Sequence, residues 1–113
     1  MFTYSATVVR VVDGDTIVFQ FDLGFHIFHV TRVRLLGVNC PERGTPEGTI
    51  ATNVVKTFCP PGKPCTVTTT KDSTDKYGRY IADVDVPGIG NLSAFLIANG
   101  HDVPLGIRDD SRL

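Results

Sequence analysis

Apolar and polar residues alternate along the first third of the chain, as is typical of strands that bury one face. Residues 4–12 (YSATVVRVV) and 16–22 (TIVFQFD) are rich in β-branched and aromatic side chains, and the turn signal DGD separates them. A third segment of this kind, residues 25–36 (FHIFHVTRVRLL), follows a turn at LGF. We therefore expect a hairpin followed by a long third strand.

The alternation also assigns the faces of the third predicted strand. It places Arg32, Arg34 and Leu36 on one face, and Val33 and Leu35 on the other. We expect the purely apolar face to be buried and the arginines to leave it on the opposite side. Taken alone, Arg34 is a surface arginine or one half of a structural ion pair.

The middle of the chain changes to helical spacing. Thr45 is a predicted N-cap, Pro46 takes the first helical position, and Glu47 lies in the first turn. The apolar residues that recur at roughly helical spacing after this start are Ile50, Val54, Val55 and Phe58. We expect these side chains to face the core. Gly48 and the β-branched residues make the segment a weak helix by propensity, so its formation depends on packing.

Two more strands and a short helix complete the predicted elements. The strands are residues 65–71 and 79–86, and the helix is residues 92–99 with Asn91 as its cap and Gly100 as its stop. Three strands, a helix, two strands and a helix is the element order of an OB-type barrel. The sequence therefore predicts a β-rich α+β fold: a five-stranded OB-type β-barrel with two or so short helices.

Length and composition indicate one globular domain. The 113 residues are enough for a single core, and 42% hydrophobic with 20% charged residues argues against disorder. We assign residues 1–105 to the domain and residues 106–113 to a polar tail. The net charge of −1 gives no protein-wide field that would attract a polyanion, so nucleic-acid binding requires a local basic cluster.

The N-terminal segment MFTYSATVVRVVDGDT has no basic n-region, no continuous apolar h-region and no small-residue cleavage site. No later segment approaches the length of a membrane span. We expect no membrane association, and a protein that is cytoplasmic or released by lysis, or secreted if a leader was trimmed. We also expect a monomer.

The cysteines and histidines form no recognisable ligand set. Three cysteines are an odd number, which argues against a dense disulfide framework. Cys59 and Cys65 bracket PPGKP and could form a disulfide, bind a metal or remain two thiols beside a turn; no C-x-x-C pair supports the metal. We interpret His26, His29 and His101 as structural because their spacing is not that of ligands.

Three short polar motifs follow one another at predicted strand ends or turns: VVDGDT, VRLLGVNCPE and DKYGR. Each alone is an ordinary turn, and DGDT is not an EF-hand loop because Ile17 stands where a third oxygen ligand is needed. Together, in this order, they resemble the staphylococcal nuclease (thermonuclease) family. The resemblance extends from about Val8 to Gly100.

The resemblance implies a calcium-dependent phosphodiesterase that cuts DNA or RNA, favours single strands or frayed ends, and leaves 3′-phosphate ends. It implies that Asp15 and the backbone carbonyl of Cys40 hold the Ca²⁺ ion. It also implies that Arg34 and Arg79 contact the scissile phosphate and that Glu42 is the general base. These types suit the chemistry, since a hard cation and planar arginine forks neutralise an anionic phosphodiester while a carboxylate activates water.

Lys76 and Tyr77 match family positions that contact a terminal phosphate of the bound nucleotide, so the resemblance implies a substrate-binding role for both. Solvated side chains in a surface turn are an equally weighted alternative. By contrast, the tyrosines that pack the nucleotide near the end of the second helix in the staphylococcal enzyme have no counterpart in HDVPLG.

The chain departs from the family pattern at Asn39, where aspartate is usual. An amide oxygen can coordinate calcium but brings no negative charge, so we expect a weaker metal site rather than an absent one. The departure supports a competing hypothesis, an OB-fold nucleic-acid-binding module that is catalytically weak or inactive. The presence of Arg34, Glu42 and Arg79 together favours the enzyme.

Overall fold

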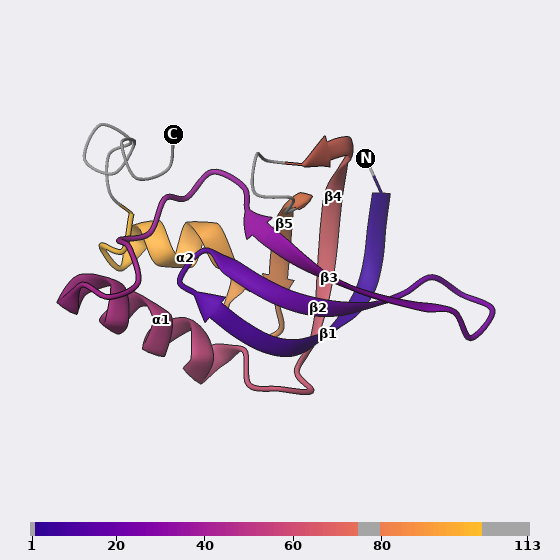
Figure 1. Ribbon diagram of the computed structural model, residues 1–113, viewed down its shortest axis with the longest axis horizontal. Helices are drawn as coiled ribbons and strands as arrows, with labels where there is room; N and C mark the ends of the chain where they lie inside the picture. The colour runs from indigo at the N-terminus through magenta and orange to yellow at the C-terminus, as the bar shows by residue number, and fades with distance from the viewer. Residues whose placement is uncertain (1, 75–79, 103–113) are drawn as a thin grey trace.

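The computed structural model (Figure 1) describes the backbone of residues 2–74 and 80–102, and the side chains of residues 2–69 and 80–102. Its elements in chain order are β1 (Phe2–Asp13), β2 (Thr16–Asp22), β3 (Phe28–Leu35), α1 (Pro46–Phe58), β4 (Pro64–Thr74), β5 (Tyr80–Val86), β6 (Gly90–Asn91) and α2 (Leu92–Ala98). The predicted order of strands and helices is confirmed. The two-residue β6 is an addition that the sequence did not indicate.

The strands close into a barrel. The sheet runs β3-β2-β1-β4-β5-β6, and a further pairing joins β3 to β5. That closing pair is parallel and sets Val33 beside Tyr80 and Arg34 beside Ile81, whereas the other strand pairs are antiparallel. Closure leaves few unpaired strand edges. The expected five-stranded OB-type barrel is therefore confirmed, as a mixed barrel with two helices.

The barrel interior follows the alternation of the sequence. Val33 and Leu35 are fully buried, while Arg34 between them is only partly covered, so the predicted faces of this strand are confirmed. The other large side chains that are fully buried include Ile17, Phe19, Val67, Val84, Leu92 and Leu96. Because one apolar core fills the barrel, the strand ends that carry polar residues are held in fixed relative positions.

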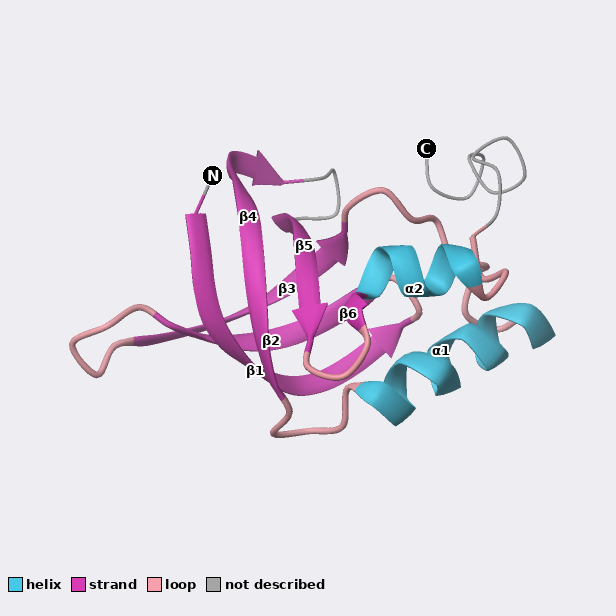
Figure 2. Ribbon diagram, turned by 180° about the vertical axis from the view of Figure 1, so that it is seen from behind, coloured by secondary structure: helices cyan, strands magenta, loops and turns pink. Residues whose placement is uncertain are grey.

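Both helices lie at the same end of the molecule and pack against the barrel (Figures 1 and 2). The two helices are joined by an edge-to-face contact between the rings of Phe58 in α1 and Phe95 in α2, whose centroids are 4.9 Å apart. The caps are as predicted: Thr45 caps α1, with Pro46 in its first turn, and Asn91 caps α2. Within the part of the chain described, neither helix combines the length and the apolar character needed to cross a membrane.

The buried face of α1 differs from the expected one. Its buried residues are Gly48, Ala51, Thr52 and Val55. Ile50, which we expected in the core, is 56% exposed, so that assignment is wrong. The helix turns its small residues toward the barrel because they allow a closer approach than Ile50 would.

The third strand is also shorter than expected, since it begins at Phe28 and not at residue 25. Gly24, Phe25 and His26 have φ values of 81°, 55° and 60°, which belong to the left-handed region and not to a strand. A turn results, in which Ile27 N donates to the carbonyl of Gly24 at 2.9 Å. The β2–β3 hairpin carries this turn away from both helices, with Phe25 94% exposed (Figures 1 and 2).

The corrected helix face gives a stability test. Val55→Ala should lower the free energy of unfolding by about 2 kcal/mol, because it leaves a cavity in the core. Ile50→Ala should stay within about 0.5 kcal/mol of the parent because the side chain is mostly solvated. Urea unfolding of the two variants measures both values, and equal losses would contradict the observed orientation of α1.

Candidate functional site

Asp15 lies in the tight turn between β1 and β2, and its side chain is 1% exposed. The turn is held by a hydrogen bond from Asp15 N to Asp13 Oδ1 at 3.2 Å and by one from Leu35 N to the Asp15 carbonyl at 2.9 Å. The carboxylate accepts from Cys40 N at Oδ2 (3.1 Å). A buried carboxylate needs such donors or a cation, so this side chain is placed for ionic chemistry.

Arg34 faces out of the barrel and turns its guanidinium toward the Asp15 carboxylate. Its Nη1 donates to the backbone carbonyls of Leu35 (2.7 Å) and Val38 (3.1 Å). Its Nη2 donates to Asn39 Oδ1 at 3.3 Å and lies 3.7 Å from Asp15 Oδ2. The two carbonyls hold one edge of the planar group, so its position is set by the backbone of the loop that follows β3.

In the loop from β3 to α1, the side chains of residues 38–40 are buried. Asn39 is 6% exposed and Cys40 is fully buried. A methyl group added at Gly14 would lie 2.9 Å from Cys40 Cβ and 3.1 Å from the side chain of Ala51, so the three residues are in close contact. The Cys40 side chain therefore belongs to the core, and only its backbone can serve the site.

Glu42 stands at the entrance of α1 and is half-buried. Its backbone carbonyl accepts from Thr45 N at 3.3 Å and from Thr45 Oγ1 at 2.7 Å. Gly48 packs so closely that a Cβ there would overlap this carbonyl. The helix cap and a glycine of the first turn thus fix the backbone from which the Glu42 carboxylate extends.

The donor atoms suit a hard cation. Asp15 Oδ2 and Asn39 Oδ1 both approach Arg34 Nη2, so a carboxylate and an amide oxygen face the same space. Oxygen donors of this kind fit Ca²⁺ better than a soft metal. Within residues 2–69 and 80–102, whose side chains the structure describes, no group of three or more His, Cys, Asp or Glu side chains forms a candidate metal cluster. The side-chain oxygens of Asp15 and Asn39, two of the predicted calcium ligands, are brought together at Arg34. Cys40 meets Asp15 through its amide N–H, and the ligand role of its carbonyl stays a prediction.

Three other predicted site residues have no structural description. Lys76, Tyr77 and Arg79 lie outside the described residues, so their roles stay predictions. Tyr80, which follows them, begins β5 beside Val33 of β3. Arg32 is exposed on the outer face of β3, as its parity requires.

The two cysteines of the α1–β4 connection are free thiols, and both are buried. The hydrogen bond between them raises the pKa of Cys59, which burial raises further. The same bond lowers the pKa of Cys65. Of the alternatives that the sequence left open, the structure does not have the disulfide between Cys59 and Cys65.

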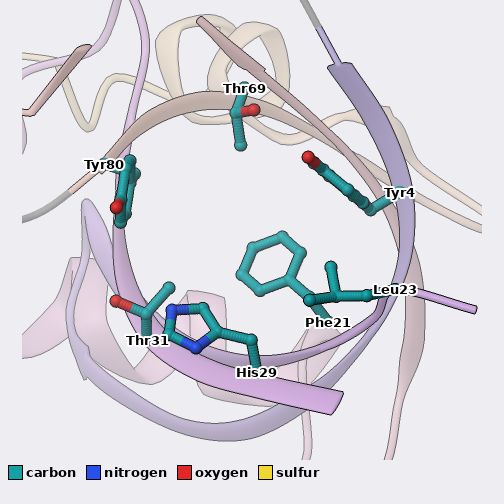
Figure 3. Close-up of a pocket in the computed structure, with 7 residues that line it drawn as sticks. All are labelled: Tyr4, Phe21, Leu23, His29, Thr31, Thr69 and Tyr80. Atoms are coloured by element: carbon teal, nitrogen blue, oxygen red, sulfur yellow. The ribbon is translucent and has the colours of Figure 1, made fainter. Parts of the chain in front are cut away.

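A second concave feature opens at the end of the barrel where β1 and β5 begin (Figure 3). This cavity of about 220 Å³ is lined by Tyr4, Phe21, Leu23, His29, Thr31, Thr69 and Tyr80. Tyr4 and Phe21 meet edge to face with centroids 5.6 Å apart. We call it the barrel-mouth pocket. It combines aromatic faces with hydroxyl and imidazole groups, and it gives His29 a surrounding that its sequence spacing did not suggest.

Sequence reasoning missed three residues that shape the site. Asp102 Oδ1 accepts a hydrogen bond from Asn39 N at 2.8 Å, and Arg43 Nη1 donates to the Val12 carbonyl at 3.1 Å. Gly48 is the third, through its contact with Glu42. A glycine in a predicted first helical turn was a usable signal, because glycine is costly in a helix unless space requires it. The other two are long-range contacts without a local signal.

Gly48→Ala tests the support of Glu42. In an ordinary helix this change stabilises by up to about 1 kcal/mol, but here the new Cβ overlaps the Glu42 carbonyl. We expect a loss of about 1–3 kcal/mol in the free energy of unfolding, by the usual cost of overpacking. The matched control is Asn53→Ala on the exposed side of α1, which should not destabilise. Denaturant unfolding compares the two, and stabilisation by Gly48→Ala would contradict the close contact.

Comparison with known proteins agrees with this geometry. Residues 32–108 match the family described as staphylococcal nuclease homologue. The chain is 32% identical over 109 residues to endonuclease YhcR of Bacillus subtilis (strain 168), an alignment that covers 87% of this chain and 9% of that protein. It is 34% identical over 93 residues to uncharacterized endonucleases of Escherichia coli O157:H7 and Escherichia coli, covering 82% of this chain and 56% of each of them.

The chain thus spans only part of the length of these relatives. The family match begins within β3 and includes Arg34 and Glu42. A family match over more than half of the chain agrees with the closed barrel and with the site residues on its strand ends. The chain belongs to the staphylococcal nuclease family.

Proposed function

We propose that this domain is a calcium-dependent phosphodiesterase that hydrolyses DNA or RNA and leaves 3′-phosphate ends. The observation that carries the proposal is the arginine fork of Arg34, which holds the oxygens of Asp15 and Asn39 beside the loop of Glu42. The relatives that are called endonucleases support it.

Asp15, Asn39 and the Cys40 carbonyl would hold the calcium ion, which supplies positive charge against the phosphate and lowers the cost of activating a water. Because Asn39 brings no charge, this site binds calcium more weakly than one with two carboxylates.

The protein groups divide the remaining work. Glu42 takes the proton of the attacking water, whose oxygen bonds to phosphorus while the bond from phosphorus to the 5′ oxygen breaks. Arg34 donates to the phosphate oxygens that gain charge, and we assign the same role to Arg79. Since Nη1 of Arg34 is held by two backbone carbonyls, we assign the contact with the phosphate to Nη2.

We further propose that the substrate is single-stranded or frayed. The barrel-mouth pocket supports this, since its aromatic side chains offer a stacking surface for an unpaired base (Figure 3). Thr31 of the pocket lies on the same strand as Arg34, about 10 Å from it at the usual strand rise.

Glu42→Gln tests the general base. We expect digestion of single-stranded DNA at millimolar calcium to slow by about 100-fold or more, which is the usual contribution of a positioned base. The matched control is Glu47→Gln, an exposed glutamate of the first turn of α1, which should cut like the parent. Addition of a chelator should stop the parent.

The outcomes separate the enzyme from the binding module. Cutting by Glu42→Gln at the parental rate, or cutting by the parent that calcium does not promote, would overturn the proposed mechanism. Binding of single-stranded DNA without any cutting would support the nucleic-acid-binding module instead.

Tyr80→Ala tests the preference for single strands. Loss of one stacking ring should weaken binding of single-stranded DNA by about 1 kcal/mol or more, a roughly fivefold effect. Phe25→Ala removes an exposed ring from the hairpin tip and serves as the control. Fluorescence anisotropy with a labelled oligonucleotide measures both variants. Equal affinities would contradict the assignment of the pocket to a base.

A further inference from the structure

The end of α2 brings a carboxylate to the candidate site. His101 N donates to the Leu96 carbonyl at 2.9 Å, and Gly100 takes a φ of 80°, so the helix stops and the chain turns. Asp102 then meets the loop between β3 and α1, where its Oδ1 accepts from Asn39 N at 2.8 Å. Asp102 is exposed at this contact, whereas Asn39 is buried.

The peptide group between Val38 and Asn39 lies between two opposite charges. Its N–H donates to the Asp102 carboxylate at 2.8 Å, and its carbonyl accepts from Arg34 Nη1 at 3.1 Å. A peptide dipole between an anion and a cation strengthens both hydrogen bonds. Asp102 is therefore linked to the guanidinium of Arg34 through a single peptide unit.

Two carboxylates also share neighbouring donors of this loop. Asp102 accepts from the N–H of Asn39, and Asp15 accepts from the N–H of Cys40, the next residue. The backbone N–H groups of two successive residues thus hold two carboxylates next to Asn39. The side chain of Asn39 itself would bind calcium only through its uncharged amide oxygen. The charge that Asn39 lacks is present beside it, on a side chain from another element.

We propose that Asp102 is a positioning residue of the cation site. It fixes the backbone of Asn39 and supplies the second negative charge from outside the set of ligand atoms. The proposal rests on the proposed calcium-dependent function. It deepens that function, because it explains how a site with Asn39 keeps enough negative charge to bind a divalent cation.

Calcium affinity, measured by titration calorimetry in the absence of nucleic acid, tests the role. Asp102→Asn keeps an oxygen that can accept from Asn39 N but removes the charge. We expect its calcium dissociation constant to rise about tenfold, the lower end of the effect of residues that support metal ligands. The matched control is Asp22→Asn, since Asp22 is another exposed aspartate that accepts one backbone N–H, that of Gly24 at 2.9 Å. This control should leave the constant unchanged.

A double-mutant cycle distinguishes charge supply from mere support of the fold. Asn39→Asp should tighten calcium binding in the parent, and should tighten it by a larger factor in the Asp102→Asn background, where it restores the missing charge. Asp102→Glu keeps the charge and should bind calcium better than Asp102→Asn. Thermal unfolding without calcium establishes that each variant is folded.

The outcomes identify which proposal fails. If Asp102→Asn binds calcium as tightly as Asp22→Asn, or if Asn39→Asp gives the same gain in both backgrounds, the role of Asp102 is overturned and the proposed function stands. If the unmodified chain binds no calcium at millimolar concentration, the calcium-dependent function is overturned, and this inference with it. If Asp102→Asn does not fold, Asp102→Ser decides, since it also removes the charge. A calcium dissociation constant about tenfold higher than that of Asp22→Asn supports the role, and an equal constant overturns it.

Discussion

The buried carboxylate of Asp15 is the constraint on which the arrangement of the site depends. A carboxylate that is 1% exposed is stable only with donors or positive charge around it. The backbone amide of Cys40 and the guanidinium of Arg34 supply these from two segments that follow the turn by many residues. Asp15 therefore links three segments electrostatically: its own turn, the end of β3 and the loop before α1. The barrel keeps these segments in contact.

Closure of the barrel fixes the position of Arg34 relative to Asp15. The parallel pairing of β3 with β5 fixes Arg34 beside Ile81, and the antiparallel pairing of β2 with β3 fixes Thr16 opposite Arg34. Asp15 precedes Thr16, so the ladder itself places the carboxylate at the level of the arginine. The strand register therefore fixes the position of the charged pair. A slip by one residue would turn the Arg34 side chain into the barrel interior.

Much of this could be predicted from local sequence signals. The caps Thr45 and Asn91, the bounds of β2 and the two faces of β3 all follow from residue type and spacing. The exposed Ile50 could not be predicted, since helical spacing does not say how near a neighbouring barrel lies. Asp102 was beyond reach for a related reason: its partner Asn39 is 63 residues away, and only the folded chain brings them together.

The contact of Gly14 with Cys40 and Ala51 places the hydrophobic core directly behind the loop that carries Asn39 and Glu42. Only the Cys40 side chain separates the core from this loop at that point. A substitution that changes the volume of a neighbouring core side chain would therefore displace the loop that carries Asn39. Mutational tolerance should consequently be uneven, because core positions near α1 affect the geometry of the site as well as stability. Repacking that region to make the domain more heat-resistant would therefore shift the loop that carries Asn39 without changing a polar residue.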